Sequence, residues 1–243
     1  MIKLDRIVKK IDNKTVLDNV GFTVKDGEIL GLVGPNGAGK TTLLNIIAGV
    51  WRQDGGTVEM DGLQRDKLGY VPDTPYLYPK LTGREFFSFV ADLYRLDQAS
   101  LKPRIDEIEK VFDLAPWLDS LMESYPRGVR QKMVIGSVLL HSPSVFLLDE
   151  PLTNLDPKSS KLVKELLQKM AGQGAAVLFS TQILEIAEKI CHRVVVLDNG
   201  RKIAEGSVAE LRELTRTPSN NLEDIFLRLT GGEKYADLLA GLT

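Results

Sequence analysis

Residues that cross-link a chain or ligate soft metals are scarce in this sequence. Cys191 is the only cysteine among the 243 residues, and His141 and His192 are the only histidines. A single cysteine excludes a disulfide within the chain and any metal site built from a cysteine cluster. It also fits a reducing compartment, in which thiols stay reduced.

Long hydrophobic runs and an excess of one charge are missing as well. No window approaches the about eighteen apolar residues that a membrane span needs, and residues 1–6 lack the continuous apolar segment of a signal peptide. The 31 basic and 33 acidic residues give a formal charge of −2, so no global field favours nucleic acid. We interpret Lys9-Lys10 as solvated surface, and we expect a cytosolic protein that is soluble by itself and has no nucleic-acid partner.

What the chain does contain is a glycine-rich segment, Gly34–Thr41, that fits the phosphate-binding pattern G-x-x-x-x-G-K-[ST]. An apolar run of strand length, residues 28–33, precedes it, and residues 42–48 carry apolar side chains at helical spacing. Glycines let the backbone wrap around phosphate oxygens, and a following helix adds unpaired N–H groups and the positive end of its dipole. We expect Lys40 to reach the β- and γ-phosphates and Thr41 to bind Mg²⁺. The alternative, a chance glycine-rich turn, rarely has both flanking elements in place.

Local patterns divide the chain into three stretches. Residues 1–33 have the alternation and turn signals of strands, whereas residues 82–141 have helical spacing and begin with a capping box, Thr82 followed by Glu85. Between residues 144 and 197 short apolar strands alternate with helices, which predicts a parallel sheet covered on both faces. The predicted fold class is α/β, a P-loop NTPase core of mixed sheet with an N-terminal antiparallel β subdomain and an inserted α-helical subdomain.

Two adjacent carboxylates, Asp149 and Glu150, follow the apolar run of residues 144–148. Asp149 fits an aspartate that holds Mg²⁺ opposite Thr41, and Glu150 fits a base that polarises the attacking water. A helix N-cap is the alternative, because acidic side chains favour that end of a helix too. Pro151 and the preceding apolar strand favour the metal site.

The order of these elements resembles the nucleotide-binding subunits of ABC transporters across nearly all of residues 1–231. The resemblance rests on the phosphate-binding segment, on Leu147-Leu148-Asp149-Glu150-Pro151, on Asn154-Leu155-Asp156-Pro157 as the D-loop, and on the helical insertion between them. Residues 221–230 also resemble the C-terminal end of ABC-2 type exporter subunits of the Ecs-like branch.

This resemblance implies a single ABC ATPase domain over residues 1–231. Its ATP-binding core with the β subdomain is residues 1–75 and 142–206, its helical subdomain is residues 76–141, and a C-terminal helical tail spans residues 207–243. ATP and Mg²⁺ are the implied cofactors. The implied ATP-binding residues are Ile11, Val16, Gly34, Pro35, Asn36, Gly37, Ala38, Gly39, Lys40, Thr41 and Thr42. The implied metal ligands are Thr41, Asp73 and Asp149, and the implied D-loop is Asn154, Leu155 and Asp156. Glu150 and Gln182 are implied to act in hydrolysis.

Three positions around the nucleotide depart from the family pattern. Ile11 stands where an adenine-stacking aromatic is usual, and it offers apolar contact without π-stacking. Asp73 occupies the Q-loop position, where its carboxylate can ligate Mg²⁺ directly or through water. Gln182 replaces the switch histidine; it can hydrogen-bond a γ-phosphate or orient water, but it does not titrate near neutral pH.

The fourth departure is the signature motif, normally Leu-Ser-Gly-Gly-Gln. It aligns here with Tyr125, Pro126, Arg127, Gly128 and Val129. In the family this motif binds the γ-phosphate of ATP held by the opposite subunit, through a serine hydroxyl and N–H groups at a helix N-terminus. Pro126 has neither a hydroxyl nor an N–H group, whereas Arg127 adds a cation.

The resemblance implies an ATP-binding subunit that dimerises head-to-tail with itself or a second ATPase and drives an integral membrane permease, with export as the implied direction. It places the protein in the cytoplasm, peripheral on the inner face of the cell membrane through that permease.

The altered signature predicts slow hydrolysis by the chain alone, and tolerated sequence drift is the alternative. A regulatory ATP-dependent clamp without a membrane partner is a second interpretation. A small-molecule kinase is disfavoured, because no residues suggest a phosphoryl-acceptor site.

Overall fold

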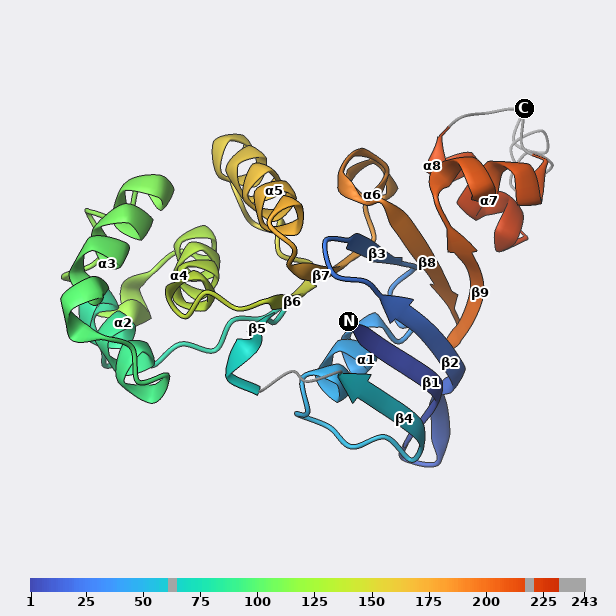
Figure 1. Ribbon diagram of the computed structural model, residues 1–243, viewed down its shortest axis with the longest axis horizontal. Helices are drawn as coiled ribbons and strands as arrows, with labels where there is room; N and C mark the ends of the chain where they lie inside the picture. The colour runs from blue at the N-terminus through green and yellow to red at the C-terminus, as the bar shows by residue number, and fades with distance from the viewer. Residues whose placement is uncertain (61–64, 217–220, 232–243) are drawn as a thin grey trace.

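A six-stranded mixed sheet forms the centre of the molecule (Figure 1). The computed structural model describes residues 1–60, 65–216 and 221–231. Five strands are parallel, and the last pairs antiparallel with its neighbour through a turn at Asn199-Gly200. In sheet order the strands are β5 (Leu68–Val71), β6 (Val145–Asp149), β7 (Ala176–Thr181), β3 (Ile29–Val33), β8 (Arg193–Asp198) and β9 (Arg201–Gly206). The predicted mixed sheet of the α/β class is confirmed.

A second, antiparallel sheet of three strands lies against it, as predicted for the N-terminal region. Its order is β2 (Lys14–Val24), β1 (Ile2–Ile11) and β4 (Gly55–Met60). The turn between β1 and β2 is tight because Asp12 and Asn13 adopt φ values of 48° and 63°, which aspartate and asparagine tolerate better than most residues.

The strands of the large sheet are buried on both faces because two layers cover them. On one face, Leu30 and Leu32 of β3 pack with the small sheet and with Leu43 and Leu44 of helix α1 (Lys40–Ile47). On the other face, Ile29 packs in a core with α4 (Arg127–Leu140) and α5 (Pro157–Gly172), and α6 (Leu184–Ile190) lies beside them. This explains the continuous apolar runs of these strands.

Three helices form a group at one side of the molecule, at the left of Figure 1. They are α2 (Gly83–Leu93), α3 (Gln98–Phe112) and α4. The predicted capping box starts α2: the Thr82 hydroxyl accepts from the Glu85 N–H, and the Glu85 carboxylate accepts from the Thr82 N–H. A short 3₁₀ turn, Met122–Ser124, lies between α3 and α4, and another, Arg65–Lys67, precedes β5.

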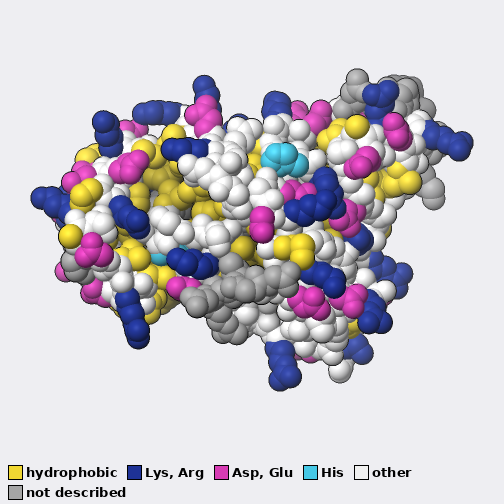
Figure 2. All heavy atoms as spheres, viewed as in Figure 1, with side chains coloured by type: hydrophobic (Ala, Val, Ile, Leu, Met, Phe, Trp, Pro, Cys, Tyr) yellow, Lys and Arg dark blue, Asp and Glu magenta, His cyan; other side chains and the backbone are white. Residues whose placement is uncertain are grey.

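A groove separates α3 from α5, where Figure 2 shows apolar side chains in a hollow. Its volume is about 520 Å³, and Ile108 and Phe112 of α3 face Leu166 and Met170 of α5 across it. Helix α4 lies at the inner side of this groove and packs on α2, α3 and β5. The helical group therefore meets the core mainly through α4.

The chain ends in two short helices, α7 (Val208–Thr215) and α8 (Leu222–Leu229), which pack on each other and on β9 and α6. Both lie in the tail predicted for residues 207–243, of which 217–220 and 232–243 are outside the described residues. Among the described helices, none combines the length and the apolar character that crossing a membrane requires.

Candidate functional site

The glycine-rich segment joins the centre of the large sheet to a helix, because residues 34–39 connect β3 to α1. Gly34 leaves no space for a side chain, since a Cβ there would overlap the carbonyl oxygen of Leu197. Gly39 has a φ of 102°, in the left-handed region that favours glycine. The path of the loop therefore requires glycine at both ends.

Lys40 is folded back onto this loop. Its Nζ donates hydrogen bonds to the carbonyl oxygens of Gly34 at 2.7 Å and Pro35 at 3.2 Å, and it lies 3.8 Å from Oε1 of Glu150. Burial lowers the pKa of Lys40, and the facing Glu150 carboxylate opposes that shift. A cation held at the start of a helix is a binding group for a phosphate anion.

A cleft of about 390 Å³ opens beside the loop. It lies at the carboxyl ends of four neighbouring parallel strands, β5, β6, β7 and β3, which is where ligands bind in open α/β sheets, and the start of α1 and Val16 of β2 complete its walls. The lining residues are Val16, Asn36, Gly37, Ala38, Gly39, Lys40, Thr41, Thr42, Asp73, Asp149, Glu150, Thr153 and Gln182.

Asp149 ends β6 at the base of this cleft and is fully buried, with 0% of its surface exposed. The Ser180 hydroxyl donates to its Oδ1 at 2.5 Å. Its Oδ2 has no hydrogen-bond partner among the residues that the structure describes. A buried carboxylate oxygen without a partner is costly, so its position is explained best by a ligand that the cleft receives.

Glu150 is held next to Asp149 by an unusual backbone. Its φ is 46°, and its N–H points at the carbonyl oxygen and hydroxyl of Ser180, at 3.3 and 3.1 Å. Burial raises the pKa of Glu150; Lys40 opposes the shift and Asp149 adds to it. A carboxylate of raised pKa that faces a lysine in a cleft has the properties of a general base.

Two further polar residues reach the cleft from neighbouring strands. Asp73 follows β5, and its pKa is raised by partial burial and by Asp149, against the effect of Lys40. Gln182 follows β7 and is exposed at the rim. The structure thus brings both positions to the cleft.

Two apolar residues predicted to bind ATP, Val16 and Ile11, differ in where they lie. Val16, on β2, lines the cleft. Ile11 ends β1, pairs with Lys14 across the turn, and is not among the residues that line the cleft. Pro35 is also absent from that lining, although its carbonyl oxygen holds Lys40.

The signature segment lies outside this cleft, at the start of α4. Tyr125 is buried and donates its hydroxyl proton to the carbonyl oxygen of Trp117 at 2.5 Å, so its ring is part of the helical group's core. Pro126 is the N-cap of α4 and provides no side-chain cap. Arg127 is exposed, whereas Gly128 and Val129 are half-buried.

The predicted D-loop residues Asn154, Leu155 and Asp156 connect β6 to α5. Asn154 has a φ of 66°, and Leu155 packs against the core. Asp156 caps α5, accepting from the Ser159 N–H at 2.9 Å. The Ser159 hydrogen bonds, followed by Lys132, hold the pKa of Asp156 far below its usual range.

Sequence reasoning missed three residues that build the site. Ser180 orients Asp149, Thr153 lines the cleft, and Gln131 donates to the carbonyl oxygen of Pro151. Only Thr153 carried a usable signal, because it lies in the loop between Glu150 and the D-loop. The other two act through contacts with segments distant in the sequence.

A family described as ABC transporter matches residues 17–153 of this chain. The chain belongs to that family. The ABC-type transporter ATP-binding protein EcsA of Bacillus subtilis (strain 168) is 34% identical over 88% of this chain and 90% of its own length. The Nod factor export ATP-binding protein I of Paraburkholderia xenovorans (strain LB400) is 33% identical over 86% of this chain and 72% of its own length.

Solved structures of ABC proteins have the same fold. A structure of the ATP-binding subunit of an ABC transporter superposes with a TM-score of 0.89 at 30% identity, over 95% of this chain and 99% of the other. The dimeric ATP-binding cassette MJ0796, in a post-hydrolysis state bound to ADP and Pi, has a TM-score of 0.77 at 26% identity, over 85% of this chain and 98% of the other. This ABC chain binds ATP and is an ATPase, and the resemblance inferred from its sequence is confirmed.

Proposed function

We propose that this ABC ATPase is the ATP-binding subunit of a membrane exporter and works in a dimer. The observation that carries the proposal is the single cleft that holds Lys40, Asp149 and Glu150 together. The direction of transport is supported by the name of one relative, a Nod factor export protein, and the dimer by the dimeric cassette of the same fold.

Mg²⁺ is the second cofactor we propose, because the donor atoms fit it. Asp149 has an unpartnered, buried oxygen, and Thr41 at the start of α1 and Asp73 after β5 line the same cleft with further oxygen atoms that could bind the ion. Among the described residues, no group of three or more His, Cys, Asp and Glu is arranged to hold a metal alone. This agrees with Mg²⁺, which is bound by one or two carboxylates together with substrate phosphates and neutralises their charge.

The protein's own groups then divide the work of hydrolysis. The N–H groups of the loop and Lys40 bind and orient the phosphates; the Lys40 ammonium donates to the carbonyl oxygens of Gly34 and Pro35 and has a third N–H for a phosphate oxygen. Glu150 accepts a proton from the attacking water as charge moves onto the phosphate. Gln182, which also lines the cleft, orients that water or bonds the γ-phosphate.

The signature residues, Tyr125 to Val129, act on the nucleotide of the opposite subunit in this proposal. Their position outside the chain's own cleft agrees with that role. Because Pro126 lacks the hydroxyl and the N–H that the family motif provides, we propose that the isolated homodimer hydrolyses ATP slowly.

An exposed aromatic surface supports a permease as the partner. Tyr76 and Phe89 flank Tyr78, whose ring lies 6.3 and 5.3 Å from theirs, and Leu93 lies exposed at the end of the same helix as Phe89. Tyr76 is 82% exposed, so the patch is apolar surface available for burial against another protein. We propose that it receives a cytoplasmic segment of the permease and so places this chain on the inner face of the membrane.

We also propose the division of the chain into an ATP-binding core (1–75 and 142–206), a helical subdomain (76–141) and a C-terminal tail (207–243). The grouping of α2, α3 and α4 at one side of the molecule supports it (Figure 1).

Co-purification of the chain with a polytopic membrane protein, lost when Tyr76 and Leu93 are both changed to serine, tests the exporter role against that of a clamp without a membrane partner.

The first prediction concerns nucleotide binding. Mg-ATP at 100 times its dissociation constant raises the free energy of unfolding by about 2.7 kcal/mol, and Lys40→Ala removes most of this gain because it removes the cation of the phosphate site. Thermal unfolding with and without Mg-ATP measures both. Lys202→Ala, which removes a surface lysine on β9, is the matched control and keeps the gain. Identical behaviour of the Lys40→Ala variant and the unchanged chain contradicts the proposal.

A further inference from the structure

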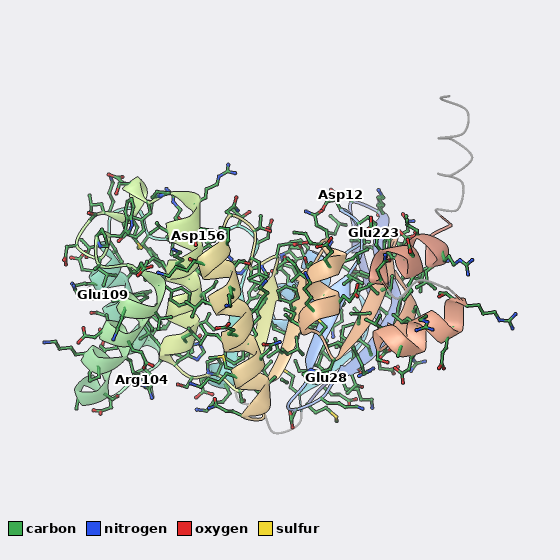
Figure 3. All side chains as sticks on the ribbon, turned by 90° about the horizontal axis from the view of Figure 1, so that it is seen from above. Asp12, Glu28, Arg104, Glu109, Asp156 and Glu223 are labelled. Atoms are coloured by element: carbon green, nitrogen blue, oxygen red, sulfur yellow. The ribbon has the colours of Figure 1, made fainter. Side chains whose placement is uncertain are left out.

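The loop that carries Glu150 is fastened to the helical group at several points. This loop, residues 150–156, runs from the end of β6 to the start of α5. Figure 3 shows Asp156, its last residue, where the start of α5 adjoins α4. Three residues of α4 reach the loop, and none of them lines the nucleotide cleft.

The first contact is made by a buried amide. Gln131 is 2% exposed, and its Nε2 donates to the carbonyl oxygen of Pro151 at 3.2 Å. That carbonyl belongs to the residue directly after Glu150. Because a buried acceptor that loses its donor costs free energy, the bond fixes the backbone beside the Glu150 carboxylate.

The second contact is an ion pair at the other end of the loop. Lys132 Nζ lies 3.1 Å from Oδ2 of Asp156, and the lysine side chain is only 14% exposed. Asp156 also accepts from the N–H and hydroxyl of Ser159, at 2.9 and 2.6 Å. Its carboxylate is therefore held in one position, from which it fixes Lys132 and with it the second turn of α4.

The third contact is steric. A Cβ on Gly128 would lie 2.7 Å from the carbonyl oxygen of Asn154, so α4 and the loop touch backbone to backbone. On the far side, the groove between α3 and α5 separates these two helices, apart from the ion pair of Lys158 with Asp113 at 2.7 Å. The loop and α4 are thus the direct link between the helical group and Glu150.

We propose that Gln131 and Lys132 are positioning residues for Glu150. They make the place of the Glu150 carboxylate depend on the place of α4, so that a partner bound to the helical group controls hydrolysis through this link. The inference rests on the proposed function, in which Glu150 is the base. Neither side chain contacts the reacting atoms; each acts by holding the loop.

The test compares Gln131→Met and Lys132→Met with the unchanged protein. Phosphate release at saturating Mg-ATP is expected to fall about tenfold to a hundredfold, because a displacement of the base of about 1 Å has an effect of that size. The dissociation constant of a fluorescent ATP analogue stays within about twofold, since neither residue lines the cleft. Lys132→Arg, which keeps the cation, restores the rate.

Lys158→Met is the matched control. Lys158 pairs with Asp113 at 2.7 Å and so also joins α5 to the helical group, but the partner in this ion pair lies outside the loop that carries Glu150. The control keeps the rate of the unchanged protein. An equal fall in the control, or rates unchanged in both test variants, overturns the inference.

A second measurement separates positioning from a general loss of structure. In a background of Glu150→Gln, adding Gln131→Met causes no further loss of rate if Gln131 acts through Glu150. A further loss, or a matching fall in thermal stability and ATP affinity, overturns the inference. If Glu150→Gln itself leaves hydrolysis unchanged, the proposed role of Glu150 fails, and the inference fails with it for that separate reason.

Discussion

His141 shows how one buried side chain ties pH to stability. It is 6% exposed, its ring stacks on Tyr94 with centroids 3.9 Å apart, and its Nδ1 lies 3.1 Å from the carbonyl oxygen of Asp66. Burial lowers the pKa of His141; the Asp66 contact opposes this shift, and Lys67 adds to it. The imidazole is therefore held neutral in a position that joins the end of α2 to the turn before β5.

The pH dependence follows from the direction of this shift. Because the folded pKa lies below the unfolded value of about 6.5, the unfolded chain takes up the proton first. Stability is lost as pH falls below about 6.5, with a slope of at most about 1.4 kcal/mol per pH unit from this group.

Urea unfolding at about pH 7.5 and about pH 5.5 measures this loss. We expect His141→Gln to lower the free energy of unfolding at both pH values, since the stacking on Tyr94 is lost, but to reduce the difference between them. His192→Gln is the control and keeps the difference, because His141 is still present. An undiminished difference in the His141→Gln variant contradicts the assignment.

At the scale of elements, the conformation of the phosphate loop depends on glycine, because Gly39 has a positive φ that other residues rarely adopt. At Gly39 the φ of 102° is combined with close neighbours: a Cβ would lie 2.7 Å from Cδ2 of Leu17 and 3.2 Å from the carbonyl oxygen of Val16. We expect Gly39→Ala to cost about 1–3 kcal/mol and to remove stabilisation by Mg-ATP, because the loop must shift. Thermal unfolding with and without Mg-ATP measures both effects.

The matched control for this loop is Gly172→Ala. Gly172 ends α5, and a Cβ there meets nothing within 4 Å. Alanine is expected to stabilise the helix by up to about 1 kcal/mol and to leave the response to Mg-ATP intact. A Gly39→Ala variant that behaves like this control contradicts the account of the loop.

Local patterns were sufficient to predict the elements that carry the site. The phosphate loop, the Asp149-Glu150 pair and the capping box at Thr82 are each specified within a few consecutive residues, and the structure has the strand, loop and helix expected around them. The pairing of β4 with β1 and the existence of β9 were not predicted, since both depend on partners elsewhere in the chain. The same limit explains why Ser180, Gln131 and Lys132 were missed.

At the scale of the whole molecule, the chain contributes two parts to ATP sites: its own nucleotide cleft, and a signature segment for the nucleotide of a second subunit. The cleft keeps the charged groups of the family, whereas the signature segment departs from the family motif. The cleft around Lys40 and Glu150 is complete in its charged groups, whereas α4 begins at a proline that offers no hydroxyl and no N–H. If the start of α4 faces the nucleotide of a second subunit, both ATP sites of a homodimer contain the altered signature segment. A partner cassette with a regular signature instead completes the site built on this chain.

We therefore expect slow ATP turnover by the purified homodimer and faster turnover, by roughly tenfold or more, when a partner cassette with a regular signature is co-assembled with it. Glu150→Gln in this chain removes the gain, because the completed site uses this chain's own base. Phosphate release by the two assemblies at equal concentrations of ATP sites measures the ratio. Rapid ATP turnover by the homodimer, abolished by Glu150→Gln, contradicts the prediction. It shows that the segment from Tyr125 to Val129 supports hydrolysis of the ATP bound by the opposite subunit without a serine.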